Sequence, residues 1–261
     1  MIPYDLTNVS VFILMTLWLF GAVVTRYFVI TSLFFIFLKI IKKSTYWRSR
    51  IVNRKNYYQG QFLTEIKWSI TTSGIFALAG AIAAVLWQKG YTAIYLDLKA
   101  NQLGYFGFSI VLAMLIHETY YYWLHRWMHH PKVFPWLHKV HHDSLVASPW
   151  TAFSFHPLEA CLQALILPII TLFLPLHPFA IVLFLLIITL SSLVNHLNVE
   201  IYPNRLIKQW PGRLLIGATH HGLHHAQFKY NFGLYFTFWD LWMRTESPRL
   251  IAHTKFAPPA P

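Results

Sequence analysis

Long apolar segments constrain the fold of this chain more than any other feature. The first covers residues 9–41 and is interrupted chiefly by Arg26. A helix crosses a bilayer in about 20 residues, so this segment predicts one long helix that extends beyond the membrane. Residues 68–87 and 104–124 predict two further membrane helices of ordinary length.

A fourth apolar segment, residues 158–194, is long enough for a pair of helices. It is broken at Pro175 and Pro178, and two prolines this close together favour a turn. We therefore expect a helical hairpin that enters the membrane and returns to the same face. Residues 125–157 and 195–250 lack long apolar runs, and they predict a histidine-rich helical cap.

The composition agrees with an integral membrane protein. Hydrophobic residues make up 56% of the chain and charged residues 11%, whereas soluble domains carry about 25% charged residues. We expect residues 1–261 to form one all-α membrane domain with about four to five transmembrane helices, the hairpin included. The N-terminus lacks a basic region and a cleavage site, so the first helix is expected to be a retained anchor.

The formal net charge of +12 does not indicate a partner nucleic acid. Seven of the basic residues lie in residues 39–55, directly after the first apolar segment. Such a basic loop is typical of the cytoplasmic side of a membrane. Alternating spans then place both cap segments on the cytoplasmic face. A bacterial inner membrane is favoured over the endoplasmic reticulum, because the chain is short and has no evident targeting signal.

Histidine is concentrated in the cap. Fourteen of the 15 histidines lie between His117 and His225. The pattern His-x-x-His-His begins at His138 and again at His221, and His-x-x-x-His begins at His125. Spacings of three and four residues place side chains on one helix face, so each motif aims several imidazoles at one point. Because neutral imidazole is the commonest nitrogen ligand of transition metals, the sequence predicts a metal site.

Eight or nine candidate imidazoles are too many for one metal ion, so we expect a centre with two. Nitrogen ligands alone leave iron, zinc, copper and nickel open. Cys161 is the only cysteine, which excludes cysteine-ligated zinc and iron–sulfur sites. A redox-active pair of metals beside a bilayer favours oxidation of a lipid by O2. Two alternatives are a non-catalytic histidine-rich membrane protein that binds or transports metal, and a zinc-dependent membrane hydrolase.

Five segments together resemble a known family. They are YYWLHRWMH (121–129), HKVHH (138–142), SPWTAFSFHPLE (148–159), HGLHH (221–225) and NFGLYFTFWD (231–240). In this combination and order they resemble the fatty acid hydroxylase/sterol desaturase superfamily of membrane histidine-box di-iron enzymes. The resemblance covers about half of the chain, and residues 1–101 contribute nothing specific to it.

The resemblance implies O2-dependent hydroxylation or desaturation of a fatty acyl or sterol-like membrane lipid. It implies two non-haem iron ions as cofactors and O2 as co-substrate. No haem domain is recognisable in the chain, so we expect a separate electron donor, cytochrome b5-like or ferredoxin-type. By position in the motifs, nine histidines match the metal site of the family: His125, His129, His138, His141, His142, His196, His221, His224 and His225.

Four further residues are expected behind these ligands: His117, Glu118, His156 and Asp240. Glu118 stands where the family often has aspartate, seven residues before the first box histidine. His156 is expected to have a structural or substrate-channel role. Carboxylates such as Asp240 and Glu159 are candidates to orient ligand imidazoles by accepting their free N–H groups.

Overall fold

The structure is a computed structural model, and it describes residues 4–97, 99 and 103–250. Over these residues the chain is helical, and its only extended pairings are two isolated bridges. The expected all-α fold is thereby confirmed. In the part of the chain that the structure describes, four helices are long and apolar enough to cross a membrane: α1 (Val9–Ile41), α3 (Gln61–Gln88), α4 (Leu103–Met128) and α9 (Pro178–Asn195).

Shorter elements connect and cover these helices. Two of them, α7 (Pro157–Ala164) and α8 (Ile166–Phe173), form the first arm of the apolar region that ends in α9. The others are α2 (Thr45–Ser49), α5 (Phe134–Leu137), α6 (Lys139–His142), η2 (Pro149–Phe153), α10 (Asn204–Lys208), η3 (Gly212–Leu214), α11 (Ala218–Gln227) and α12 (Phe238–Trp242).

Helix α9 begins where the sequence has its proline-containing break. His177 is the N-cap residue, and its Nδ1 accepts a hydrogen bond from the backbone N–H of Phe179 at 3.2 Å. Pro178 occupies the first helical position, where a missing N–H costs nothing. A hydrophobic cluster that includes Ile170 of α8 and Phe184 of α9 joins the two arms. The chain therefore reverses direction at this break, and the two arms pack against each other.

The helices enclose an aromatic centre beside the cap. Tyr27 of α1 is fully buried, and its ring stacks on Phe153 of η2 with 5.4 Å between centroids. The Tyr27 hydroxyl donates to the backbone carbonyl of Trp150. Leu193 of α9 belongs to the same cluster. A short cap element is thus fixed between two of the long helices.

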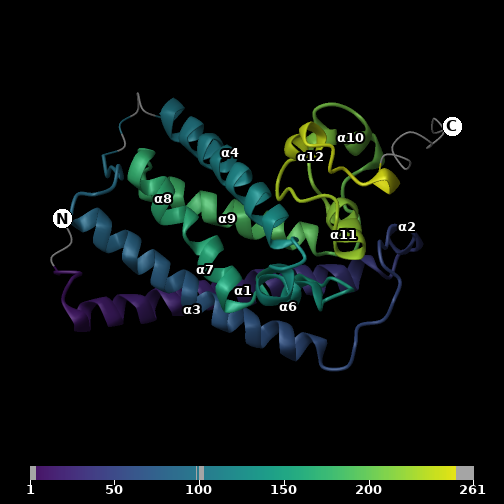
Figure 1. The fold of residues 1–261 in the computed structure, drawn as a ribbon, viewed down its shortest axis with the longest axis horizontal. Coiled ribbons are helices and arrows are strands. Elements are labelled where there is room, and N and C mark those ends of the chain that lie inside the picture. The colour runs from purple at the N-terminus through teal and green to yellow at the C-terminus, as the bar shows by residue number, and fades with distance from the viewer. Residues whose placement is uncertain (1–3, 98, 100–102, 251–261) are drawn as a thin grey trace.

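The cap elements gather at one end of the long helices. Figure 1 shows α10, α11 and α12 beyond the right-hand ends of α4 and α9, with α6 close to the end of α4. The C-terminal ends of α4 and α9 therefore point toward the same region as α6 and α11. These are the elements that carry the histidine motifs.

A buried carboxylate attaches the cap to α3. Both oxygens of Glu65 accept hydrogen bonds, and the donors are Gln61 Nε2, Ser144 Oγ, Ser148 Oγ and Thr151 Oγ1, each at 2.8 Å. The side chain of Glu65 is almost completely buried. Because Ser144, Ser148 and Thr151 follow the second histidine motif, this network holds that motif's continuation against the membrane helices.

Candidate metal centre

The end of α4 and the turn after it carry the first pair of imidazoles. His125 lies on the last turn of α4, and His129 follows one residue after the helix ends. Their ring centroids are 5.1 Å apart, as expected for side chains four residues apart on one helical face. Pro131, two residues farther on, keeps the helix from continuing.

The nine candidate histidines divide into two groups, and the candidate ligand atoms of each group lie within 4.8 Å of one another. The first group, which we call group one, contains His125, His129, His138, His142 and His224. The second, group two, contains His141, His196, His221 and His225. Eight of the nine side chains are buried, and His129 is half-buried.

Imidazole nitrogens face each other at short range in both groups. In group one, Nε2 of His125 and Nε2 of His138 are 3.0 Å apart. In group two, Nε2 of His196 lies 3.2 Å from Nε2 of His141 and 3.0 Å from Nε2 of His221. Two nitrogens bound at right angles to one metal at about 2.1 Å would lie about 3.0 Å apart. The spacing therefore suits a shared first-row metal ion.

The hydrogen bonds of the Nδ1 atoms determine whether the Nε2 atoms that face one another carry a proton. His125 Nδ1 lies 2.8 Å from the carbonyl oxygen of Phe232, and His196 Nδ1 lies 2.7 Å from that of Ser192. A carbonyl oxygen only accepts, so Nδ1 carries the proton in both rings. His141 makes the same kind of contact at 3.3 Å. In a neutral ring, Nε2 then presents a lone pair.

Lone pairs therefore point at one another inside each group. His141 and His196 both donate through Nδ1, so their facing Nε2 atoms cannot share a hydrogen bond while both rings are neutral. Burial lowers the pKa of His196 to about 4 and holds that of His141 well below its ordinary value, which disfavours a protonated ring. A cation between these nitrogens satisfies them, so the donor set fits a metal ion.

A carboxylate contacts one of the candidate imidazoles directly. Oε1 of Glu159, in α7, accepts a hydrogen bond from Nδ1 of His138 at 2.8 Å. It also accepts one from Nε2 of Gln163 at 2.9 Å. A buried carboxylate behind a ligand imidazole fixes the ring and makes its free nitrogen a better donor to a metal. Glu159 is therefore placed to orient His138 in the way that the sequence analysis expects of it.

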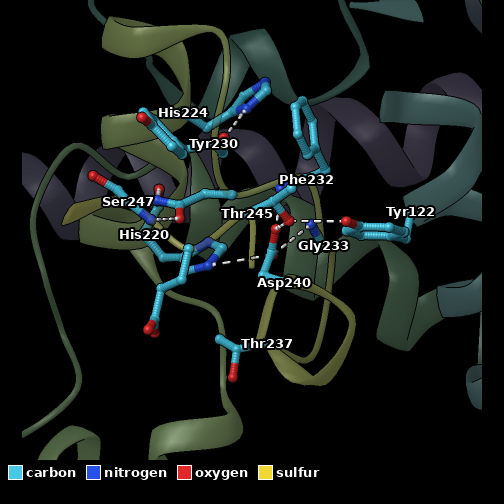
Figure 2. Close-up of polar contacts among 12 residues, drawn as sticks. Tyr122, His220, His224, Tyr230, Phe232, Gly233, Thr237, Asp240, Thr245 and Ser247 are labelled. Carbon is cyan, nitrogen blue, oxygen red and sulfur yellow. Dashed lines mark hydrogen bonds and ion pairs between the residues drawn. The ribbon is translucent and has the colours of Figure 1, made fainter. Parts of the chain in front are cut away.

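Asp240 acts on the ligands through the loop of residues 230–235. Its carboxylate accepts hydrogen bonds from the backbone N–H groups of Phe232 and Gly233 and from the Thr245 hydroxyl, at 2.7 to 3.0 Å. Figure 2 shows these contacts converging on Asp240. The carbonyl of Phe232 in turn accepts from His125, so Asp240 positions that ring without touching it.

The same loop supports a second imidazole. Nδ1 of His224 donates to the carbonyl of Tyr230 at 2.8 Å. Glu118, on α4, accepts hydrogen bonds from the N–H groups of Leu234 and Tyr235 at 3.0 and 2.7 Å. Two buried carboxylates, from α4 and from α12, thus hold the loop from its two sides. Glu118 contacts the loop backbone rather than an imidazole.

The other two expected supporting residues have different surroundings. Nδ1 of His117 is 2.9 Å from the hydroxyl of Tyr235, and His117 belongs to neither group. His156 is the N-cap residue of α7, where its Nδ1 accepts from the N–H of Leu158. The ring of His156 lies 6.1 Å from that of Trp68. His156 thus has a structural role at a helix end.

An apolar cavity of about 170 Å³ adjoins group two. His141 and His196 lie in its wall together with side chains from α1, α3, α4, α8 and α9. Apolar residues such as Phe76 and Phe184 form most of this wall. Its polar members include Arg26 and His117. An apolar chain that enters this space would contact one of the two histidine groups.

A family model described as fatty acid hydroxylase matches residues 110–245, just over half of the chain. The chain belongs to the fatty acid hydroxylase family. The match contains all nine imidazoles of the two groups and both carboxylates that hold the 230–235 loop. The resemblance drawn from the five sequence segments is thereby confirmed.

The chain is similar to curated enzymes whose names refer to sterol desaturation or lathosterol oxidation. The chain is 30% identical over 236 residues to a Delta(7)-sterol 5(6)-desaturase of Eremothecium gossypii, covering 85% of this chain and 65% of that protein. It is 31% identical to one of Candida albicans (89% and 56%) and 29% identical to human lathosterol oxidase (73% and 62%). The chain thus spans less than two thirds of these relatives. No solved structure is significantly similar to it.

The long helices indicate where the chain resides. The four long apolar helices make the chain a multi-pass membrane protein. The relatives named above come from two fungi and from human, so the preference for a bacterial inner membrane gains no support from them.

Some functional contacts had no signal in the sequence motifs. Glu65 precedes the apolar segment 68–87 and is far from any histidine, and its partners in the cap stand about eighty residues away in the chain. Glu200 accepts a hydrogen bond from the N–H of Thr219, at the beginning of α11, which carries three of the imidazoles. The one indication in the sequence was the position of these acidic residues outside the motifs. A carboxylate that is buried on folding requires hydrogen-bond partners, so such a residue points to contacts elsewhere in the chain.

Proposed function

We propose that this protein is an O2-dependent lipid hydroxylase or desaturase that holds two iron ions, one in each histidine group. One observation carries the proposal: unprotonated imidazole nitrogens face one another, about 3 Å apart, beside an apolar cavity. Iron bound there would supply the redox chemistry needed to attack an unactivated C–H bond with O2. Membership of the fatty acid hydroxylase family supports the same conclusion.

The protein's own residues would hold and shield the reacting groups. Carbonyl and carboxylate partners of the Nδ1 atoms keep five of the nine rings turned inward, so these rings need little reorganisation when metal binds; they are His125, His138, His141, His196 and His224. Phe153 and Phe155 in the cavity wall would exclude water from the lipid beside group two. The apolar wall would hold the lipid in one orientation, and orientation at the reacting carbon largely determines the rate.

The overall reaction requires a reductant. Hydroxylation converts R–H, O2, two electrons and two protons into R–OH and water. Desaturation takes two hydrogens from adjacent carbons and, with the same O2, electrons and protons, gives a double bond and two waters. We therefore propose a separate electron donor, cytochrome b5-like or ferredoxin-type, docking on the face of the cap. The basic residues 39–55 suggest that this face is cytoplasmic.

The proposed substrate is a sterol-like or fatty acyl lipid. The relatives' names refer to Delta(7)-sterol desaturation and lathosterol oxidation, which favours a sterol-like substrate. A metal transporter would place ligands near the middle of its spans, whereas both groups here lie where the long helices end. A zinc hydrolase needs about three ligands beside an open position, fewer than either group offers.

The test is turnover by the iron-loaded chain in lipid nanodiscs, with cytochrome b5, its reductase and NADH. Lathosterol and palmitate are offered separately under ¹⁸O2, and products are identified by mass spectrometry. We expect an O2-dependent alcohol or alkene from one of them, abolished in His141→Ala. Hydrolysis of an ester lipid without O2, and no oxidised product, would support the zinc hydrolase instead.

A further inference from the structure

Arg26 is a charged residue in the middle of the apolar helix α1. It lies in the wall of the cavity that adjoins group two. The same side chain also borders a shallow hollow on the outer face of α1, beside Trp18 and Val29. Its Nε is buried and has no hydrogen-bond partner among the described residues. An ionisable residue at such a depth is costly and usually marks a functional site.

The acidic side chains of the neighbouring helices are already engaged elsewhere. The Glu65 carboxylate accepts four hydrogen bonds from cap residues and from Gln61. The Glu118 carboxylate accepts from the backbone of the 230–235 loop, and Glu159 accepts from His138. Among the residues that the structure describes, no carboxylate forms an ion pair with Arg26.

We propose that Arg26 binds the oxygen-bearing end of the lipid substrate inside this cavity. A guanidinium group offers only donors, so its natural ligand is an oxygen that accepts hydrogen bonds. In a largely apolar wall, the lipid's hydroxyl or carboxylate supplies that oxygen. The inference rests on the proposed function, because it takes the cavity to be the lipid site. It adds the substrate class: an amphiphilic lipid with a free hydroxyl or carboxylate end.

Fixing one end of a lipid determines which carbon faces the metals. The cavity wall contains Arg26 on α1 and, from the cap side, His141 and His196. The rest of the wall is largely apolar and would allow a chain or ring system to slide. A charged anchor removes that freedom, so Arg26 is a positioning and specificity-determining residue.

The experiment measures lipid binding and product position in the iron-loaded full chain. The sterol pair is lathosterol and its 3-methyl ether, and the fatty acid pair is palmitate and methyl palmitate. We expect the wild type to bind the free member of one pair about tenfold to a hundredfold more tightly than its methylated partner. The pair that shows this preference identifies whether a hydroxyl or a carboxylate is bound.

Arg26→Met should bind both members of that pair equally and give products oxidised at more than one carbon. Arg26→Lys, which keeps a donor charge, should restore part of the preference. Thr25→Val, on the exposed neighbouring position, is the matched control and should behave as the wild type. A preference that persists in Arg26→Met would overturn the inference, as would a wild type that prefers neither free lipid.

The outcomes separate the inference from the proposed function. Arg26-dependent binding without any O2-dependent product would support the anchor and contradict the oxygenase. A normal product with unchanged position in Arg26→Met would support the oxygenase and contradict the anchor. Should Arg26→Met fail to fold, the comparison of free and methylated lipids on the wild type and on Arg26→Lys still decides the question.

Discussion

Glu159 and His138 are joined by a 2.8 Å contact between Oε1 and Nδ1, and both side chains are essentially inaccessible to solvent. The contact comes from two different elements, because Glu159 lies on α7 and His138 lies at the junction of α5 and α6. It directs Nε2 of His138 toward Nε2 of His125, 3.0 Å away. A membrane-side helix thereby determines the direction of a cap ligand.

Loss of this carboxylate should weaken metal binding. In Glu159→Gln the amide cannot accept as strongly from Nδ1, and the ring loses its fixed orientation. We expect metal affinity to fall about tenfold to a hundredfold, as is usual for partners behind ligands. Competition with a chelator of known affinity measures the change. Asp143→Asn, which alters an exposed carboxylate paired with Lys139, should leave the affinity unchanged, and an equal loss in both variants would contradict the orienting role.

Replacing Glu65 should destabilise the attachment of the cap to α3. Glu65→Ala leaves four buried donors without their acceptor, which we expect to cost about 3 kcal/mol or more. The thermal midpoint of the detergent-solubilised protein is the measurement. Thr64→Ala changes the exposed neighbouring residue and should alter the midpoint little. A Glu65→Ala protein as stable as Thr64→Ala would show that the network contributes nothing.

Gly233 should not tolerate a side chain. A Cβ at this position would lie 2.6 Å from the carbonyl oxygen of Phe236 and 2.9 Å from Oε1 of Glu118. Gly233→Ala should therefore displace the 230–235 loop, cost about 1–3 kcal/mol of stability and reduce metal retention. At Gly107, inside α4, a Cβ meets nothing within 4 Å. Gly107→Ala should be neutral or mildly stabilising, and similar behaviour of the two variants would contradict the packing described.

Asp240 should contribute a pH-dependent part of the stability. Burial raises its pKa from 3.8 to about 6. The folded protein therefore favours the protonated carboxyl, so this contribution is complete below about pH 4 and is lost as the pH rises through 6. The stability of the wild type relative to Asp240→Asn should fall by roughly 3 kcal/mol over that interval and then stay constant. Thermal midpoints of both proteins between pH 4 and 8 measure this change. A wild type whose stability relative to Asp240→Asn rises with pH would contradict the assignment.

The sequence predicts the long helices well because their physical cause is local. An apolar run must satisfy its own backbone hydrogen bonds inside a membrane, and only a helix does so within one segment. Residues 9–41 therefore match α1. Helix α3, however, begins at Gln61 rather than at residue 68, because the buried pair Gln61 and Glu65 is polar yet hydrogen-bonded to the cap.

The histidine motifs also predict that the imidazoles converge, but not how they divide. His141 and His142 are neighbours in sequence and belong to different groups, as do His224 and His225. Adjacent residues on a helix point about 100° apart, so one short helix between two centres can serve both. Glu159 stands within a motif, but the pairing of backbone carbonyls with the outer nitrogens depends on loops that meet only in the folded chain, and no motif encodes it.

The most direct test of the two-group centre is the metal content of the purified, iron-loaded protein. We expect about two irons per chain in the wild type, and about one in His224→Ala of group one and in His196→Ala of group two. His130→Ala, which removes a histidine outside both groups, should retain two. A wild type that binds a single metal, or ligand variants that keep the full complement, would contradict the division into two metal-binding groups.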